Sequence, residues 1–191
     1  MLHRKELFTI PNLLSFYRMF AFPLILYFIF SGKEQLFAIF LIINLVTDVL
    51  DGMIARWLRQ ETDFGARIDS IADFLTYALA FLGIYFFKLD EFLPHATSFL
   101  TFVGLTIAVM LLSLIKFGRL PSLHLYSWKI GGYIQGFFFI WIFAIGFNTP
   151  LYYFMITWAI LSAIEHIVIQ LIIPEMRSNA KGLYWILKQK Q

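Results

Sequence analysis

Four aspartates are the residues of this chain best placed to do chemistry. Asp48 and Asp51 are three residues apart, so they share one face of a helix. Asp69 and Asp73 are four apart and also share a face. If a hairpin turn is centred near Gln60, the inner pair lies nine residues from it on each side, and the outer pair lies twelve and thirteen away. In an antiparallel hairpin equal distances mean equal depth, about 13–20 Å from the turn at 1.5 Å per residue. The four carboxylates are therefore predicted to meet at one level.

Such a cluster needs compensation within an apolar pair of helices. One aspartate at the centre of a spanning helix costs about 2.5–3.5 kcal/mol before mutual repulsion is counted. Protonation of all four or a bound cation removes that cost. Carboxylate oxygens, in a chain without cysteine and with no histidine nearby, favour a hard ion, Mg²⁺ or Mn²⁺. One ion fits this chemistry, and so does a two-ion clamp on a diphosphate. The alternatives are a polar water-filled gap, or a cation transporter, which would spread its acidic groups along a path.

Small and basic residues follow the first aspartate pair. Gly52 and Ala55 have little or no side chain, so a flat base or a phosphate could approach the helix backbone there. Small residues also serve the packing of helices on one another. Arg56 is placed to contact a phosphate through two parallel hydrogen bonds, or is an ordinary flanking charge. Thr62 and Gly65 lie in the expected turn, where hydroxyl and glycine also have purely local uses.

Together these residues follow the pattern D-x2-D-G-x2-A-R-x8-G-x3-D-x3-D over residues 48–73. This pattern resembles the signature of the CDP-alcohol phosphotransferase family, membrane enzymes of phospholipid head-group synthesis. The resemblance implies transfer of a substituted phosphate from a CDP-linked lipid such as CDP-diacylglycerol to a small alcohol, with release of CMP. It implies that Asp48, Asp51, Asp69 and Asp73 hold the metal. It also implies that Asp73 is the general base that takes the proton of the acceptor hydroxyl.

The resemblance further implies a set of residues that contact the CDP-linked donor. The matching motif positions are Gly52, Ala55, Arg56, Thr62 and Gly65, of which the alanine and the last glycine keep space. Family members also tend to carry Pro-Asn near the first span and a downstream arginine, which is similar to Asn12 and Arg18 here. Asn12 suits a helix N-cap equally well. Arg18 lies inside an expected span, which favours pairing with a substrate phosphate or an aspartate.

The elements that carry these residues are expected to be membrane helices. The 191 residues are 60% hydrophobic and 14% charged, whereas soluble domains are about 25% charged. A spanning helix needs about 20 apolar residues, and the chain has six such stretches, at about 13–31, 35–58, 67–87, 95–116, 128–147 and 150–173. We predict an all-α bundle of six transmembrane helices forming a single domain, 1–191. Short amphipathic helices are expected at both ends, over 2–8 and 183–190.

The basic residues predict the orientation of this bundle. With six spans both termini lie on one side. Of the 15 lysines and arginines, only Lys33 and Lys88 then fall on the other side, a strong bias toward a cytoplasmic location of the termini. The aspartates would lie in the cytoplasmic half of a multi-pass cell-membrane protein. The first twelve residues show no pattern of a removable signal peptide.

A second basic cluster is a candidate for binding the alcohol acceptor. It consists of Lys116, Arg119 and Lys129, with His124 between them, at the expected cytoplasmic ends of the fourth and fifth spans. It would suit a phosphorylated polyol or the carboxylate of serine, and ordinary flanking charge explains it equally well. Ser70 stands where glycerol-phosphate enzymes of the family usually have proline. The sequence therefore favours a phosphatidylserine- or phosphoinositol-type synthase over a phosphatidylglycerophosphate type without choosing among them.

Two further pairs have open roles. Glu165 and His166 lie within the last span and suit either a functional site or hydrogen bonds between helices. Gly132 and Gly136 form a small-xxx-small pair that suits helix packing, including a homodimer contact. We expect no nucleic acid partner.

Overall fold

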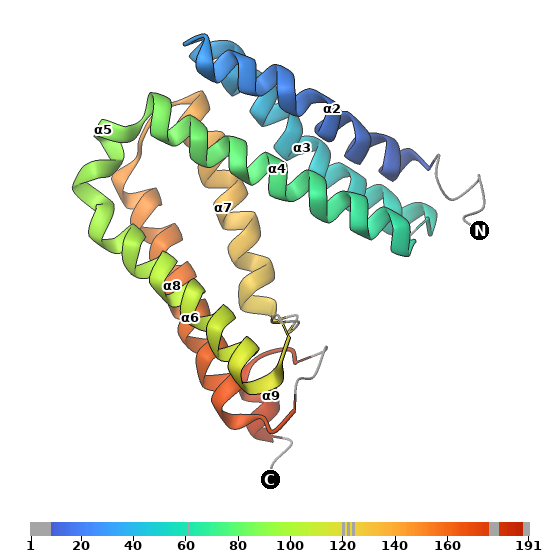
Figure 1. Cartoon of the computed structure of the whole chain (residues 1–191), viewed down its shortest axis with the longest axis vertical. Coiled ribbons are helices and arrows are strands. Elements are labelled where there is room, and N and C mark those ends of the chain that lie inside the picture. The colour runs from blue at the N-terminus through green and yellow to red at the C-terminus, as the bar shows by residue number, and fades with distance from the viewer. Residues whose placement is uncertain are drawn as a thin grey trace. The chain divides into compact units, whose positions relative to one another are not determined.

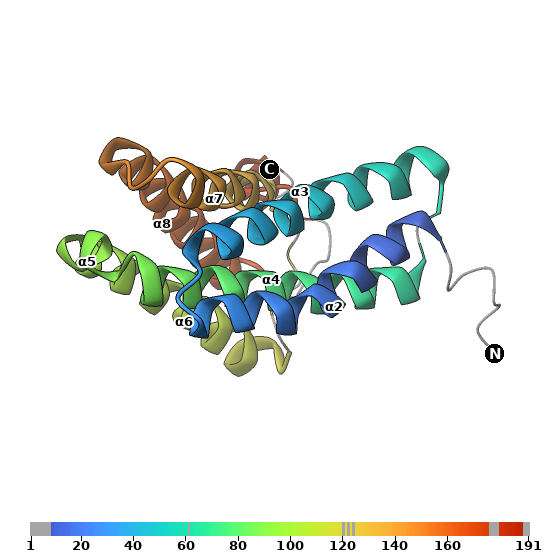
Figure 2. The same ribbon diagram turned by 90° about the horizontal axis from the view of Figure 1, so that it is seen from above.

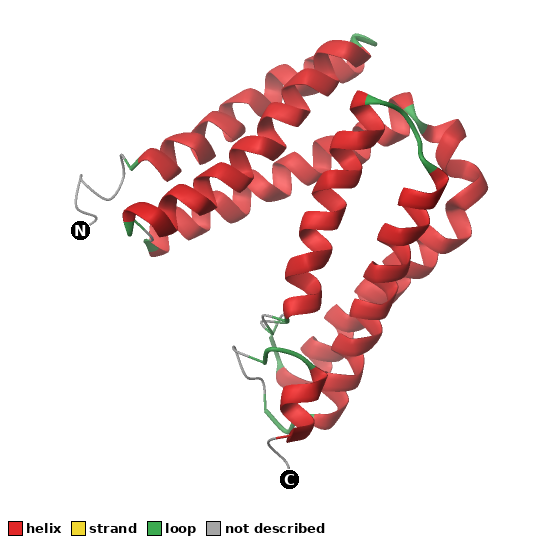
Figure 3. Cartoon of the chain, turned by 180° about the vertical axis from the view of Figure 1, so that it is seen from behind, coloured by secondary structure: helices red, strands yellow, loops and turns green. Residues whose placement is uncertain are grey.

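The computed structural model describes residues 9–60, 62–119, 121, 123, 125–175 and 180–188. Within these residues all regular structure is helical and no strand occurs (Figure 3). The chain divides into two compact units. The first comprises Met1–Glu91 with Phe139–Gly146, and the second Phe92–Phe138 with Phe147–Gln191.

The first unit is built on three long helices, α2 (Ile10–Phe30), α3 (Glu34–Leu58) and α4 (Asp63–Phe87). They lie side by side in both views of Figures 1 and 2. The last turns of α7 join them, because Phe143 packs edge-on against Phe37 of α3, with ring centroids 5.0 Å apart. This unit carries all four aspartates.

Local chemistry explains where α2 begins and ends. Thr9 caps its start, and the hydroxyl accepts from the backbone N–H of Asn12 at 3.3 Å. Pro11 lies in the first turn, where its missing N–H costs nothing. The helix ends at Phe30, and Gly32 with φ of 67° makes the turn into α3.

The hairpin between α3 and α4 turns where the sequence predicts it. Arg59 ends α3 in the left-handed conformation, with φ of 52°. Two residues beyond the turn centre, Thr62 caps α4, and its hydroxyl accepts from the N–H of Gly65 at 3.0 Å. The expectation of turn chemistry at Thr62 and Gly65 is thus confirmed.

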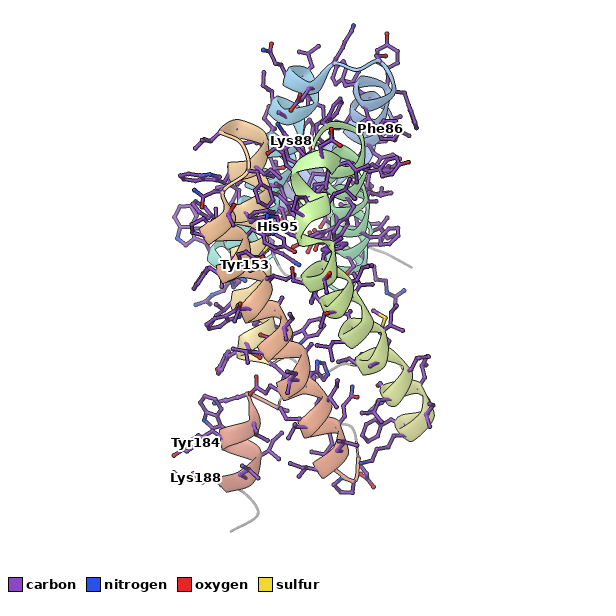
Figure 4. The ribbon with its side chains drawn as sticks, turned by 90° about the vertical axis from the view of Figure 1, so that its left-hand side faces the viewer. Phe86, Lys88, His95, Tyr153, Tyr184 and Lys188 are labelled. Atoms are coloured by element: carbon purple, nitrogen blue, oxygen red, sulfur yellow. The ribbon has the colours of Figure 1, made fainter. Side chains whose placement is uncertain are left out.

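The second unit is built on α6 (Ala96–Phe117) and α8 (Thr149–Ile172), with most of α7 (Tyr126–Ala144) and the short α9 (Leu183–Lys188). A short α5 (Leu89–Phe92) and one 3-10 turn (Leu93–His95) precede α6. At the start of this unit Nδ1 of His95 forms a hydrogen bond with the hydroxyl of Tyr153, at 3.1 Å. Figure 4 shows these two side chains between α6 and α8. At its other end α8 packs on α9 around Ile169 and Ile186.

The six predicted apolar stretches each coincide with a long helix. Among the described residues, five stretches of helix are long and apolar enough to cross a membrane. The helix α7 is not among them, because its first half carries Lys129, Gln135 and glycines. The predicted terminal helix over 183–190 appears as α9, and the one over 2–8 lies outside the described residues.

Candidate functional site

A polar stripe runs along one face of α2. Asn12, Ser15 and Arg18 follow one another at intervals of three, which places them on neighbouring positions of that face. Their exposed fractions are only 2%, 3% and 1%. Buried polar groups are normally hydrogen-bonded, so this stripe marks where α2 meets polar partners on α3 and α4. Asn12 is not the helix cap, since Thr9 has that role.

The guanidinium of Arg18 draws the four aspartates together. It donates from Nη1 to Asp48 at 2.5 Å and to Asp73 at 2.6 Å, and from Nη2 to Asp51 and Asp69 at 2.5 Å each. The predicted convergence of the four carboxylates at one level is therefore observed, and so is the expected pairing of Arg18 with an aspartate.

The charges within this cluster do not balance. Four carboxylates and one guanidinium leave a formal charge of −3 (−4 + 1). Asp51 is 4% exposed, while Asp48, Asp69 and Asp73 are 36–40% exposed. The cluster therefore has a buried inner member and an accessible outer side, and it attracts further positive charge.

The donor set fits a divalent metal ion. One carboxylate oxygen from each of Asp48, Asp51 and Asp69 lies within 4.8 Å of the others, close enough to share an ion. The acidic ligands are all oxygens, which suits a hard cation. The three partly exposed carboxylates leave room for water or phosphate oxygens in the remaining positions.

A pocket of about 240 Å³ opens beside the carboxylates. Its walls come from α2, α3, α4 and the α3–α4 turn. They are formed by Pro11, Asn12, Ser15, Asp51, Gly52, Ala55, Arg56, Gln60, Thr62, Gly65, Ala66 and Asp69. Every donor-contact residue predicted from the sequence lies in these walls except Arg18, which lies among the carboxylates instead. Asp51 and Asp69 belong both to the pocket and to the aspartate cluster.

Two glycines in the pocket are small for different reasons. A Cβ at Gly65 would lie 2.5 Å from Oδ1 of Asn12, so glycine lets α4 approach α2. A Cβ at Gly52 would meet only Nη2 of Arg56, at 3.9 Å, an ordinary contact. Packing within the described chain therefore does not require glycine at 52, and its effect is to keep the pocket wall low.

Sequence reasoning missed Ser15, Gln60 and Ala66 among the pocket residues. For Ser15 a signal existed, because it lies three residues from both Asn12 and Arg18 on the same helix face. For Gln60 there was none beyond its place in the turn. Arg56 is exposed in the pocket wall and forms no ion pair with any described side chain.

The residues predicted to bind the acceptor belong to the second unit. The ammonium of Lys116 donates to the carbonyls of Gln170 and Leu171 at 2.8 and 2.9 Å, so it caps the end of α8. The backbone carbonyl of Arg119 accepts from the hydroxyl of Ser113 at 2.8 Å, and Lys129 is exposed on α7.

The remaining sequence candidates have local structural roles. The hydroxyl of Ser70 donates to the Ala66 carbonyl at 2.8 Å on an exposed face and does not line the pocket. Glu165 accepts from the N–H of Leu183 at 2.9 Å and so ties α9 to α8.

His166 is buried beside the ring of Trp128, whose centroid is 5.2 Å away. A Cβ at Gly132 or Gly136 would meet no described atom within 4 Å. The expected packing at this glycine pair is therefore wrong for contacts within the described part of the chain.

Comparison with known proteins agrees with this site. The family model of CDP-alcohol phosphatidyltransferase matches residues 8–172. The chain is 30% identical over 119 residues to the CDP-diacylglycerol–glycerol-3-phosphate 3-phosphatidyltransferase of Aquifex aeolicus, covering 62% of this chain and 67% of that enzyme.

Two further relatives match over shorter stretches. The enzyme of the same name from Pectobacterium atrosepticum is 36% identical over 95 residues, 47% of this chain and 52% of the relative. A probable CMP-forming cardiolipin synthase of Drosophila melanogaster is 41% identical over 71 residues, 37% of this chain and 22% of the relative. No solved structure matches the chain.

The match over residues 8–172 places this chain in the CDP-alcohol phosphatidyltransferase family. Members of this family are metal-dependent membrane enzymes that transfer phosphatidyl groups from CDP-linked donors to alcohols in phospholipid biosynthesis.

Proposed function

We propose that this chain transfers the phosphatidyl group of CDP-diacylglycerol to a small alcohol and releases CMP. The observation that carries the proposal is the junction of two features, a pocket walled by small and polar residues and a cluster of carboxylates. Asp51 and Asp69 belong to both. A nucleotide in the pocket would thus direct its diphosphate toward the charged cluster.

The proposed donor site uses the residues around the pocket. Gly52 and Ala55 leave space for the flat base and the ribose. Gly65 lets α4 approach Asn12, which together with Thr62 supplies polar groups beside that space. Arg56, exposed at the wall, would bind a phosphate of the donor. Arg18 would act from within the cluster by holding the carboxylates in place.

The proposed reaction is a single displacement at phosphorus. The acceptor oxygen forms a bond to the phosphorus of the phosphatidyl group, and the bond from that phosphorus to the bridging oxygen of CMP breaks. Asp73 takes the hydroxyl proton as the acceptor attacks. Its carboxylate is 37% exposed, so an acceptor can reach it. Mg²⁺ or Mn²⁺, one ion or two, held by Asp48, Asp51, Asp69 and Asp73, would neutralise the charge of the diphosphate.

For the acceptor we propose a glycerol-phosphate compound. The support is that the relatives described above are two CDP-diacylglycerol–glycerol-3-phosphate 3-phosphatidyltransferases and a probable cardiolipin synthase. The serine at position 70 had favoured serine- or inositol-type enzymes, but its hydroxyl bonds a backbone carbonyl away from the pocket. Binding of the acceptor by Lys129 and Arg119, expected from the sequence, stays a prediction. Lys116 has a structural role in capping α8 that competes with such a contact.

We further propose that α7 completes a six-span bundle and that residues 1–191 act as one domain. The positive charges favour cytoplasmic termini and an active site that faces the cytoplasm. A homodimer through the open glycine face of α7 stays a prediction.

The test is an assay of the purified full chain with CDP-diacylglycerol and Mn²⁺ or Mg²⁺. Glycerol-3-phosphate, phosphatidylglycerol, serine and inositol phosphate are each offered as acceptor, and CMP is measured. We expect CMP release with a glycerol-based acceptor, loss of release with EDTA and recovery on adding back the ion. No CMP with any of the four acceptors would overturn the proposal, and release with serine alone would overturn the choice of acceptor.

A further inference from the structure

Ser15 lies at the point where the pocket, the arginine and the carboxylates meet. Its hydroxyl donates to Oδ2 of Asp51 at 3.2 Å and accepts from Nη2 of Arg18 at 3.4 Å. The same residue lines the pocket. With 3% exposure it is closed to bulk water, so these protein contacts decide its orientation.

The hydroxyl has one proton and two acceptors within reach. The carbonyl of Pro11, one turn earlier in α2, is 3.4 Å away, the usual partner of a serine inside a helix. Oδ2 of Asp51 is nearer, at 3.2 Å, and is charged. Hydrogen bonds to ionised acceptors are roughly twice as strong as neutral ones, so the proton goes to the carboxylate.

Asp51 is the carboxylate that most needs such a donor. It is 4% exposed, whereas its three neighbours in the cluster are 36–40% exposed. Water can hydrogen-bond the other three, but Asp51 is oriented by Arg18 and Ser15. One oxygen, Oδ2, receives both of these bonds.

We propose that Ser15 is a positioning residue for metal binding: by holding Oδ2 of Asp51, it orients the buried carboxylate toward the ion shared with Asp48 and Asp69. The inference rests on the proposed function, since that function makes the aspartates metal ligands. Removing a hydrogen-bond partner of a metal ligand typically weakens metal binding 10–100-fold, and we expect an effect of that size here.

The experiment is a Mn²⁺ titration of the full chain in detergent, with free Mn²⁺ followed by electron paramagnetic resonance. Ser15→Ala is expected to bind Mn²⁺ at least 10-fold more weakly, while Ser15→Thr, which keeps the hydroxyl, stays within about threefold of the wild type. Ser162→Ala is the matched control, because Ser162 is also a buried helix serine but donates only to the Trp158 carbonyl of its own helix, at 2.8 Å. Thermal unfolding by circular dichroism establishes that each variant is folded.

Unchanged Mn²⁺ affinity in Ser15→Ala would overturn the inference, and so would an equal loss in Ser162→Ala. The difference between these two alanine variants decides the matter even if the threonine variant folds poorly. A wild-type chain that binds no Mn²⁺ would instead overturn the metal site of the proposed function, and the inference with it. The two failures are therefore distinguishable.

Discussion

Polar side chains that bond from one helix to another have different partners in the two units. In the second unit they bond mainly to backbone carbonyls. Trp128 donates to Ser162, Trp158 to Ser127, and Gln170 to Val109, each to a main-chain oxygen. In the first unit Arg18 donates to four carboxylates, and Ser15 donates to one of them.

The difference separates a structural use of polarity from a functional one. A donor that reaches a carbonyl of a neighbouring helix satisfies both groups and leaves no net charge. The aspartate cluster instead leaves a charge of −3 and three partly exposed carboxylates, an excess of like charge that costs stability. Active sites typically hold such charge clusters, which destabilise the protein when it is free and are stabilised when a ligand of opposite charge binds.

The largest effect is expected when the cluster loses its proposed base. Asp73→Asn keeps the size of the side chain and an acceptor for Arg18, but it removes the proton acceptor and a metal ligand. We expect turnover to fall by about 10²–10⁴-fold while thermal unfolding is retained. Asp90→Asn, at an exposed position of the short helix α5, is the control and should keep its activity. Wild-type turnover in Asp73→Asn would remove this residue from its role.

Removal of the Arg18 guanidinium, the positive charge at the centre of the aspartate cluster, tests the comparison of the two units directly. Arg18→Met leaves four carboxylates uncompensated around a buried site, and we expect the free energy of unfolding to drop by about 3–5 kcal/mol. Lys116→Met in the second unit loses the bonds to two carbonyls and the contact of the ammonium with the Phe117 ring, which we expect to cost about 1.5–3 kcal/mol. Added Mn²⁺ should stabilise Arg18→Met more than the wild type, whereas it should stabilise Lys116→Met by the same amount as the wild type. Equal losses with no difference in the response to Mn²⁺ would contradict the distinction.

Two glycines sharpen the contrast between a packing role and a pocket role. Gly52→Ala meets no close atom, so stability should be unchanged or rise by up to about 1 kcal/mol through helix propensity. Its expected defect is a donor KM raised by about tenfold, or about 1.4 kcal/mol. Gly83→Ala, whose Cβ would overlap the ring of Phe37, should lose about 1–3 kcal/mol of stability and keep the donor KM. The reverse pattern would argue against the pocket as donor site.

The smallest effect is expected at the ion pair far from the cluster along α3 and α4. Lys88 lies 2.9 Å from Glu34 and 3.5 Å from Glu91. Burial by itself lowers the pKa of Lys88, but the hydrogen bonds and negative charges of Glu34 and Glu91 outweigh burial and raise that pKa. The pair therefore stabilises the fold below the pKa of an unfolded lysine and ceases to do so as the pH rises through the folded pKa.

Lys88→Met should accordingly lower the free energy of unfolding by at most about 1 kcal/mol. The difference from the wild type should be equal at pH 7 and pH 9 and should shrink above about pH 10.4, the ordinary lysine value. Thermal unfolding across this range measures it. If the difference in the free energy of unfolding between the wild type and Lys88→Met instead grew as the pH rose, the stabilisation could not come from a positive charge on Lys88.

Much of the site follows from the sequence because spacing within helices is rigid. Intervals of three and four residues, counted outward from the turn near Gln60, placed Asp48, Asp51, Asp69 and Asp73 at one level, and the structure brings them together around one guanidinium. Six apolar stretches likewise predicted the six long helices to within a few residues.

Tertiary structure alone decided which face of α2 meets the motif. The side-chain contacts of Ser15 and Arg18 reach across 36 and up to 55 residues of chain, and no local rule selects between partners at such separations. The same holds for Gly52 and Gly65, which look alike in the sequence; only the distance to a neighbouring helix shows that one lets helices pack and the other keeps a pocket open. Periodicity determines which residues share a face, whereas the packing of one helix on another determines what that face contacts.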